Sequence, residues 1–357
     1  MMEETACVVA FDARQHTLLF LDLNGMVWQC GVESSVPVKV CYPLPPIVSV
    51  HQSFNRSYFI EEDGSVWGVG SNELGQLGHS CNTLAKIPNL CNIKTIFSGQ
   101  ACTFFHEESG WLWGCGWLIY DPFAMEGDEI AITATPVRMN RRIPDLKAIS
   151  INEHHAVYLD AEGSVWRPKK PLLKTARIDK QLLDEFAKVR KIPKMQAMTS
   201  MYNHTLLLDV DGGVWSFGNN TSQECGLDIA TNKFSNPTKI PNIPPMKEVC
   251  VGYDFSVTLD EDGGIWGFGH NGQQRLWSGS QAQPVSRPKK LEGVPPAKKI
   301  ICGTSYTMAV DEEGAIWAIG LSKSLAFQSD KFIKLPGLPL VNELERRTTR
   351  TKSARNV

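Results

Sequence analysis

Tryptophan recurs along this chain at near-regular intervals, and this periodicity constrains the fold more than any other feature of the sequence. Seven of the ten Trp follow one another at spacings of 39 to 53 residues, each with a Gly three residues before it and an acid six residues before it. With Gly at 29 of 357 positions, seven such matches would arise by chance with a probability of roughly 10⁻⁸. The sets are Trp28, Trp67, Trp113, Trp166, Trp215, Trp266 and Trp317, with Gly25, Gly64, Gly110, Gly163, Gly212, Gly263 and Gly314, and with Asp22, Glu61, Glu107, Asp160, Asp209, Asp260 and Asp311. The chain therefore contains seven copies of one structural unit.

Each unit begins with the pattern of a β-hairpin. An apolar run leads to the acid, two polar residues and the Gly follow, and a second apolar run carries the Trp, as residues 204–217 illustrate. Gly can take positive φ in the turn between two such runs, and an Asp carboxylate can accept backbone N–H groups there. We therefore expect at least two antiparallel strands in every unit.

Two more short strands complete each unit. A Gly three residues after the Trp ends the second apolar run in six units, and a polar loop of variable length follows. Then come a short strand with Pro near one end, as in residues 136–139 and 237–240, and an apolar run such as residues 247–251. Four short strands in about 50 residues are typical of a propeller blade. The sequence predicts an all-β, seven-bladed β-propeller with four-stranded antiparallel blades.

One unit carries the residues of a known repeat. Residues 67–79, WGVGSNELGQLGH, together with residues 61–66, resemble the repeat of the regulator of chromosome condensation (RCC1) family, and His155-Ala156 and His204-Thr205 occupy its matching strand. The resemblance covers about residues 5–337 and is weakest in the fourth unit, where Arg167-Pro168-Lys169 follows Trp166. It implies a ring closed by N- and C-terminal strands in one shared blade, with residues 6–10 pairing near the last unit.

The domain boundaries follow from the repeats. Residues 1–337 are expected to form one RCC1-like propeller, with insertions at about 117–135 and 167–191, and residues 338–357 a basic, flexible tail. The second insertion carries nine basic residues against three acids, and Leu182, Leu183, Phe186 and Val189 recur in it at helical spacing. This pattern predicts a short amphipathic helix.

The residues shared by all seven units are interpreted as architecture, since a residue that every blade repeats is one that every blade needs. Each Trp is expected to bury on the order of 200 Å² against a neighbouring sheet. The sequence has no G-x-S-x-G, H-E-x-x-H or G-x-x-x-x-G-K-[ST] motif and no C-x-x-C pair. His155 and His204 in adjacent blades would lie roughly 10 Å apart, too far to share a metal. We expect no enzyme activity, cofactor or metal.

Recognition is expected where the repeats differ, because loops on a rigid scaffold carry binding. The loops before the His-Thr strand would gather on one face, and they supply the candidate partner-binding residues His154, His155, Asn203, His204, Tyr253 and Asp254. For His204 a hydrogen-bonded strand histidine is the alternative interpretation. Further candidates are Asp128 in the acidic insertion and Lys169, Lys170 and Lys174 in the basic one.

The leading hypothesis is a non-enzymatic propeller that binds a protein partner through its loop faces. The resemblance implies an alternative, guanine-nucleotide exchange on a Ran-like small GTPase, with the exchange role carried to His154 and Asp254. A third hypothesis is chromatin or nucleic-acid binding through local basic patches, because a net charge of 36 − 38 = −2 gives no overall basic field.

The sequence also bears on location. Glu3 and Glu4 stand where a signal peptide would be basic, and the aromatic-rich run 111–120 is shorter than the roughly 18 residues of a membrane span. Single, scattered Cys residues are typical of a reducing compartment. We expect a monomer in the cytoplasm, the nucleus or both, without a membrane span.

Overall fold

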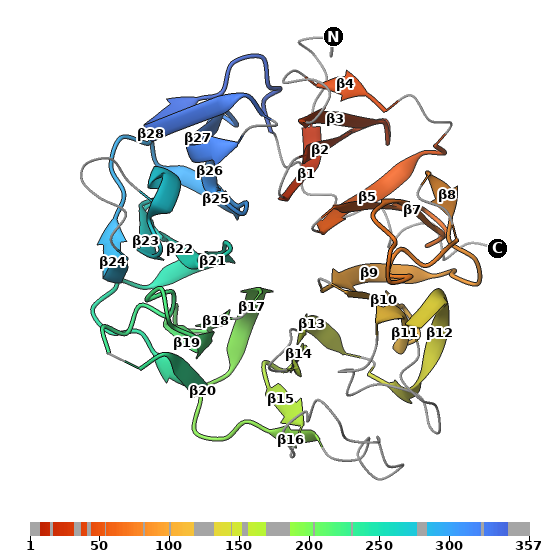
Figure 1. Cartoon of the computed structure of the whole chain (residues 1–357), viewed down its shortest axis with the longest axis horizontal. Coiled ribbons are helices and arrows are strands. Elements are labelled where there is room, and N and C mark those ends of the chain that lie inside the picture. The colour runs from red at the N-terminus through yellow and green to blue at the C-terminus, as the bar shows by residue number, and fades with distance from the viewer. Residues whose placement is uncertain are drawn as a thin grey trace, which may run out of the picture.

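Seven four-stranded sheets stand around a common axis in the computed structural model of the chain (Figure 1). The structure describes residues 8–14, 17–31, 37–40, 44–53, 55–80, 83–99, 101–117, 132–143, 145–151, 156–168, 186–202, 204–229, 231–276, 284–322 and 325–341. Within each sheet the strands are antiparallel and adjacent in sequence order. The first strand of each blade lies nearest the axis and the fourth lies at the perimeter (Figure 1). The prediction of an all-β, seven-bladed propeller with four-stranded antiparallel blades is confirmed.

The blades follow one another along the chain. Blade 1 contains β1 (Val8–Arg14), β2 (Thr17–Asp22), β3 (Val27–Gly31) and β4 (Val38–Lys39); blade 2 contains β5 (Ile47–Ser53), β6 (Arg56–Glu61), β7 (Val66–Gly70) and β8 (Ala85–Lys86); blade 3 contains β9 (Ile93–Ser98), β10 (Cys102–Glu107), β11 (Trp111–Trp117) and β12 (Ile132–Arg142). Blade 4 contains β13 (Leu146–Ile151), β14 (Ala156–Asp160), β15 (Val165–Pro168) and β16 (Phe186–Lys188); blade 5 contains β17 (Met195–Met201), β18 (His204–Asp209), β19 (Val214–Asn219) and β20 (Lys233–Lys239). Blade 6 contains β21 (Met246–Val251), β22 (Phe255–Asp260), β23 (Ile265–Gly269), the 3₁₀ turn η2 (Gly272–Gln274) and β24 (Val285–Lys290); blade 7 contains β25 (Ala297–Cys302), β26 (Tyr306–Asp311), β27 (Ile316–Ser322) and β28 (Phe327–Lys334).

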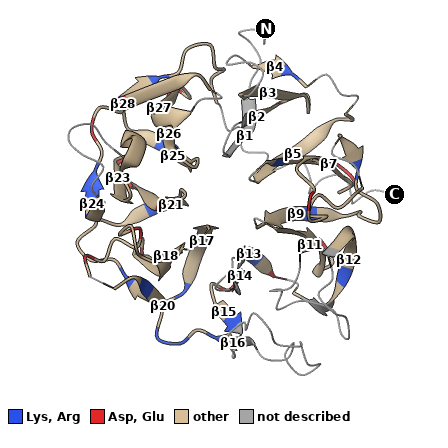
Figure 2. Ribbon diagram, in the orientation of Figure 1, with Lys and Arg blue, Asp and Glu red and all other residues tan. Residues whose placement is uncertain are grey.

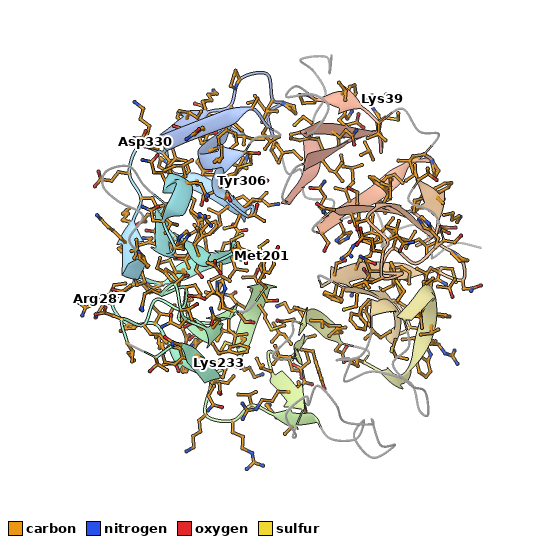
Figure 3. All side chains as sticks on the ribbon, in the orientation of Figure 1. Lys39, Met201, Lys233, Arg287, Tyr306 and Asp330 are labelled. Carbon is orange, nitrogen blue, oxygen red and sulfur yellow. The ribbon has the colours of Figure 1, made fainter. Side chains whose placement is uncertain are left out.

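The apolar core is divided among the blade interfaces. Each of the seven apolar clusters of the described residues joins two neighbouring blades, and side chains fill the space between the sheets (Figure 3). The second strand of a blade serves both neighbours. In β18, Leu207 packs toward blade 4, whereas Leu206 and Leu208 pack toward blade 6. All six residues of β18 are consequently buried, without the alternation of a half-exposed strand.

Ring closure differs from the prediction of a shared blade. Strand β1 pairs with β2 inside blade 1, and the strands of blade 7 all come from the C-terminal part of the chain. The two ends of the ring meet through side chains, because Leu18 and Phe20 of β2 share a cluster with Tyr306 and Met308 of β26. For residues 8–10 the expected pairing with the last unit is therefore wrong, and residues 6 and 7 lie outside the described residues. In the part of the chain that the structure describes, apolar packing closes the ring and no strand ladder joins blades 1 and 7.

The acid and the Trp of every repeat are hydrogen-bonded to each other. In all seven blades the indole Nε1–H donates to the carboxylate six residues earlier, at 2.6 to 3.1 Å. The other carboxylate oxygen of Asp209 accepts the turn amides of Asp211 and Gly213, at 3.0 and 2.6 Å. This confirms the expected capping of the turn and adds the indole as a partner of the same acid.

The Trp rings are half-buried and lie at the interfaces. Each ring packs against the cluster that joins its own blade to the preceding blade: Trp28 to blade 7, Trp67 to blade 1, Trp113 to blade 2, Trp166 to blade 3, Trp215 to blade 4, Trp266 to blade 5 and Trp317 to blade 6. The hydrogen bond thus positions a ring that connects two sheets.

A basic residue faces the Trp across the sheet in every blade, a repeat that sequence reasoning missed. The fourth-strand partners of the seven Trp are Lys39, Lys86, Arg138, Lys188, Lys239, Lys290 and Lys334. Lys86 reaches the Glu61 carboxylate at 3.1 Å and Lys290 reaches Asp260 at 3.9 Å. The fourth strands carry a single acid, Asp330, and Figure 2 shows their basic residues along the perimeter. Charged side chains on outer strands oppose edge-to-edge pairing with other chains.

The insertions and the tail differ in part from expectation. Phe186 begins strand β16, so the prediction of an amphipathic helix is wrong at this position. Leu182 and Leu183 lie outside the described residues. Strand β12 begins at Ile132, inside the predicted acidic insertion. Val341 is buried and its N–H donates to the Gly314 carbonyl at 2.8 Å, so the contacts of the propeller extend beyond residue 337. Residues 342–357 lie outside the described residues.

Replacing one repeated acid should destabilise the ring. Asp209→Ala removes the acceptor of Trp215 Nε1 and of two turn amides, and we expect the free energy of unfolding to fall by about 2–4 kcal/mol. Urea denaturation followed by circular dichroism measures this. The control is Asp211→Ala, which changes an exposed residue of the same turn. Equal losses in the two variants would contradict the assigned role of Asp209.

Candidate functional site

Loops from blades 5, 6 and 7 line a pocket of about 380 Å³ on one face of the ring. The loops between the first and second strands contribute Tyr202, then Tyr253 and Asp254, then Thr304 and Ser305. The segment after β23 contributes His270, Gln273 and Arg275. Both kinds of segment emerge on the same face because the strands alternate in direction. We call this site the loop-face pocket.

The backbone around Asp254 is held by close contacts. The N–H of Gly252 donates to the Phe255 carbonyl at 2.8 Å and closes the loop, and the N–H of His270 donates to the Asp254 carbonyl at 2.8 Å. Gly269 ends β23 with a φ of +99°, and a Cβ there would stand 2.7 Å from the Asp254 carbonyl oxygen. Only Gly permits this approach. The repeated Gly after the Trp therefore lets the loop between the first and second strands pack against the end of the third strand.

Asp254 is a half-buried carboxylate. Burial raises the pKa of its carboxyl, and the Coulombic effects of His270 and Arg275 partly offset that rise. The Coulombic effect of Asp254 in turn contributes to the raised pKa of Glu224, whose main cause is burial. Among the described residues, no side chain forms a hydrogen bond or an ion pair with the Asp254 carboxylate.

Arg275 is buried and its guanidinium is used within the protein. Nε donates to the Gly272 carbonyl at 2.7 Å, one terminal nitrogen donates to the Thr304 carbonyl at 3.0 Å, and the other donates to Gln273 Oε1. Burial lowers the pKa of Arg275 to about 10. Arg275 therefore ties the 3₁₀ turn of blade 6 to the loop of blade 7.

His270 completes the wall. Burial lowers its pKa, with a further lowering by Arg275, while Asp254 acts in the opposite direction. Its Nδ1 is buried and has no hydrogen-bond partner among the described residues. The imidazole is therefore neutral at pH 7, and the pocket combines one carboxylate with one internally bonded guanidinium.

The candidate residues from the sequence are only partly brought together. Tyr253 and Asp254 line the loop-face pocket, whereas His204 is completely buried and its Nε2 lies 2.9 Å from Ser256 Oγ. His204 is thus a hydrogen-bonded strand histidine between blades 5 and 6, and we do not retain it as a partner contact. The remaining candidates, His154, His155, Asn203, Asp128, Lys169, Lys170 and Lys174, lie outside the described residues.

Sequence reasoning missed Arg275 and His270, although the repeat contained a signal. Asn72, Asn220 and Asn271 each accept, through Oδ1, the backbone N–H five residues later. The residue before that N–H is Gln76 in blade 2, Glu224 in blade 5 and Arg275 in blade 6. This position is buried in all three blades, yet blades 5 and 6 place a charged residue there. A charged residue at such a repeated, buried position is the signal that could have identified Arg275.

The described residues support no metal centre. They contain no group of three His, Cys, Asp or Glu side chains able to hold a metal ion. Burial raises the pKa of Cys30 and Cys225 to about 12, so these thiols are protonated at neutral pH. Among the described helices, none has the length and hydropathy needed to cross a membrane.

Comparison with known families identifies the repeats. The family model described as "Regulator of chromosome condensation (RCC1) repeat" matches residues 211–259 and 262–310. The chain is thus a seven-bladed propeller in which residues 211–259 and 262–310 match the RCC1 repeat. The two matched segments contain every residue that lines the loop-face pocket except Tyr202.

Curated relatives match over different lengths. The chain is 33% identical over 92 residues to a Rho GTPase-activating protein, gacGG, of Dictyostelium discoideum, which covers 25% of this chain and 8% of that protein. It is 27% identical over 285 residues to the probable E3 ubiquitin-protein ligase HERC4 of Rattus norvegicus, covering 74% of this chain and 26% of that protein. The chain thus spans about a quarter or less of these relatives.

Solved structures share the fold. Yeast RCC1 (Prp20) bound to Kap60 superposes with a TM-score of 0.67 at 19% identity, over 87% of this chain and 79% of that chain. Prp20p from Saccharomyces cerevisiae, in a study of its binding to Gsp1p and histones, gives a TM-score of 0.68 at 19% identity, over 85% and 80% of the two chains. These likenesses establish the common propeller architecture.

The buried His204 gives the propeller a pH-dependent stability. Burial lowers its pKa from 6.5 to about 4, so below pH 6.5 the unfolded chain binds a proton that the folded chain does not. The free energy of unfolding is therefore unaffected by the titration of His204 above pH 6.5. It falls as the pH drops from 6.5 toward 4, by up to about 1.4 kcal/mol per pH unit.

His204→Gln removes this titration. As the pH falls from 7 to 4.5, the free energy of unfolding of the parent protein should therefore decrease more than that of His204→Gln. Urea denaturation at several pH values measures it. A difference that does not depend on pH would contradict a neutral, buried His204.

Proposed function

We propose that this chain is a non-enzymatic protein-binding propeller and that the loop-face pocket is its main contact site. The observation that carries the proposal is Tyr253, a residue that is 42% exposed beside the half-buried Asp254. Tyr253 packs edge-to-face on Tyr202, with ring centroids 4.2 Å apart. An exposed, rigidly supported aromatic next to a desolvated charge is typical of interface hot spots.

The scaffold suits this role. The interface clusters hold neighbouring blades together, so loops from three blades keep fixed relative positions. A preformed surface loses little conformational entropy on binding, and such surfaces bind partners without large rearrangement. The comparisons support the proposal at the level of architecture, because Prp20 has been crystallised with Kap60 and studied with Gsp1p and histones. A cytoplasmic or nuclear location and a monomeric state stay predictions.

Site-specific photo-crosslinking tests the proposal. A benzoylphenylalanine placed at Tyr253 should form an adduct with a partner protein in cells, and mass spectrometry identifies that protein. The matched control places the same group at Val210, which is 57% exposed in the turn between β18 and β19, on the opposite face. The adduct should be absent at position 210 and reduced by Asp254→Asn. No adduct at 253, or equal adducts at both positions, would remove the proposal.

We propose a second candidate function, guanine-nucleotide exchange on a small GTPase. It is supported by Asp254, an accessible carboxylate in the loop before the second strand of blade 6, which is the position the family resemblance points to. Exchange would follow from linkage: a propeller that binds the nucleotide-free GTPase more tightly than the loaded form lowers nucleotide affinity by the same factor.

Nucleotide release from a panel of small GTPases distinguishes the two functions. If exchange occurs, Asp254→Asn should slow release by about tenfold or more, while Asp262→Asn, an exposed acid in the turn between β22 and β23, should not. Absence of acceleration with every GTPase would exclude this candidate. Acceleration that Asp254→Asn leaves unchanged would exclude Asp254 as its residue.

A further inference from the structure

The loop-face pocket has a carboxylate that can accept hydrogen bonds, whereas the nitrogens of its arginine already donate to acceptors within the protein. The Asp254 carboxylate has no hydrogen-bond or ion-pair partner among the described residues, although it is half-buried. An unpaired carboxylate in a partly desolvated site gains more from an added cation than an exposed one does, because screening by water is weaker. The pocket therefore has an unmet requirement for positive charge beside Asp254.

Arg275 does not meet that requirement directly. All three of its side-chain nitrogens donate to other acceptors, the carbonyls of Gly272 and Thr304 and the side chain of Gln273. Its guanidinium carbon lies 5.3 Å from the centroid of the Phe255 ring. For an incoming anion Arg275 thus has few donors left, and the buried Glu224 adds negative charge near Asp254.

The outer wall of the pocket is aromatic. Tyr202 holds a φ of 53°, a left-handed conformation that non-glycine residues rarely adopt, and its ring supports that of Tyr253. An arginine side chain suits such a pair of surfaces, since its planar guanidinium stacks on an aromatic face and donates two parallel hydrogen bonds to a carboxylate. A lysine ammonium is a compact, strongly hydrated charge and gains less from either surface.

We infer that the loop-face pocket binds an arginine side chain of the protein partner, with Asp254 accepting its hydrogen bonds and Tyr253 stacking on its guanidinium. The inference rests on the proposed function and specifies the chemistry of the partner. The pocket volume of about 380 Å³ is at the small end of ligand sites, a size suited to one long side chain.

Short peptides of defined composition test the inference on the full-length protein. The probes are acetylated, amidated pentapeptides Gly-Gly-X-Gly-Gly with Arg, Lys, Gln or Glu at X, titrated by isothermal calorimetry at low salt. The Arg peptide should bind with a Kd on the order of 1 mM, about tenfold more tightly than the Gln peptide and more tightly than the Lys peptide. The Glu peptide should show no binding.

Variants locate the binding. Asp254→Asn should lower the affinity for the Arg peptide by about tenfold. Tyr253→Leu, a change at an exposed residue, should lower it several-fold. Asp262→Asn is the control and should leave the affinity unchanged. Thermal unfolding verifies that each variant is folded, and Tyr253→Leu keeps the test valid if Asp254→Asn is unstable.

The pH profile adds an independent readout. The titratable groups that interact with Asp254 are His270, Arg275 and Glu224. Because burial raises the pKa of Asp254, affinity for the Arg peptide should fall in acid at a higher pH than the titration of an ordinary Asp would give, and it should still fall in His270→Gln. This second result separates loss of the carboxylate charge from protonation of the imidazole.

Two results would overturn the inference: a Glu peptide that binds as tightly as the Arg peptide, or an Arg affinity that Asp254→Asn leaves unchanged. Either can be told apart from failure of the proposed function. If position 253 crosslinks a partner but the pocket does not prefer Arg, the partner uses other chemistry. If the pocket prefers Arg but position 253 crosslinks no partner, the loop face is not the protein contact.

Discussion

A hydrogen bond from an indole N–H to a carboxylate six residues earlier recurs in all seven blades, and the rest of the ring depends on it. The bond closes the hairpin between the second and third strands and sets the angle of the Trp ring. That ring then packs on the cluster shared with the preceding blade, as Trp215 does with blade 4. A contact between residues close in sequence thus determines an interface between sheets, which explains how one short pattern can specify a seven-bladed ring.

The same regularity allows the loops to vary. Because the strands and their glycines carry the packing, a change in a loop between blades costs little stability. Arg275 illustrates this, since it stands where blade 2 has Gln76 and uses its charge to join the turn of blade 6 to the loop of blade 7. Asp254 is held by Gly269 and His270 through the backbone, and its carboxylate has no hydrogen-bond or ion-pair partner among the described residues. The proposed contact site therefore lies on blades 5 to 7, where these departures meet.

Much of the fold could be predicted from the sequence, because the acid, Gly and Trp lie within one hairpin at fixed spacing. Features that depend on variable loops could not. The basic residue facing each Trp is separated from it by a loop whose length changes from blade to blade, so Lys39 and Lys334 show no common offset. Phe186 and Val189 fit a helical period, but a strand of three residues shows no period of its own. The burial of His204 follows from a second strand covered on both faces, which a pattern of alternation does not reveal. Whether β1 pairs with β2 or with the last blade depends on contacts far apart in sequence. In the site, Asp254 and Tyr253 could be identified from the repeat, whereas Arg275 required the positions of three segments in space.

Hydrogen exchange at the tryptophan indoles tests the central claim most directly. In ¹⁵N-labelled protein the side-chain N–H groups of Trp28, Trp67, Trp113, Trp166, Trp215, Trp266 and Trp317 should all exchange far more slowly than the indole N–H of free tryptophan, because each donates to a carboxylate at a blade interface. Replacing one acid, as in Asp260→Ala, should accelerate exchange at Trp266 above all others. Rapid exchange at several of the seven, or a uniform response to the Asp260 substitution, would contradict the account.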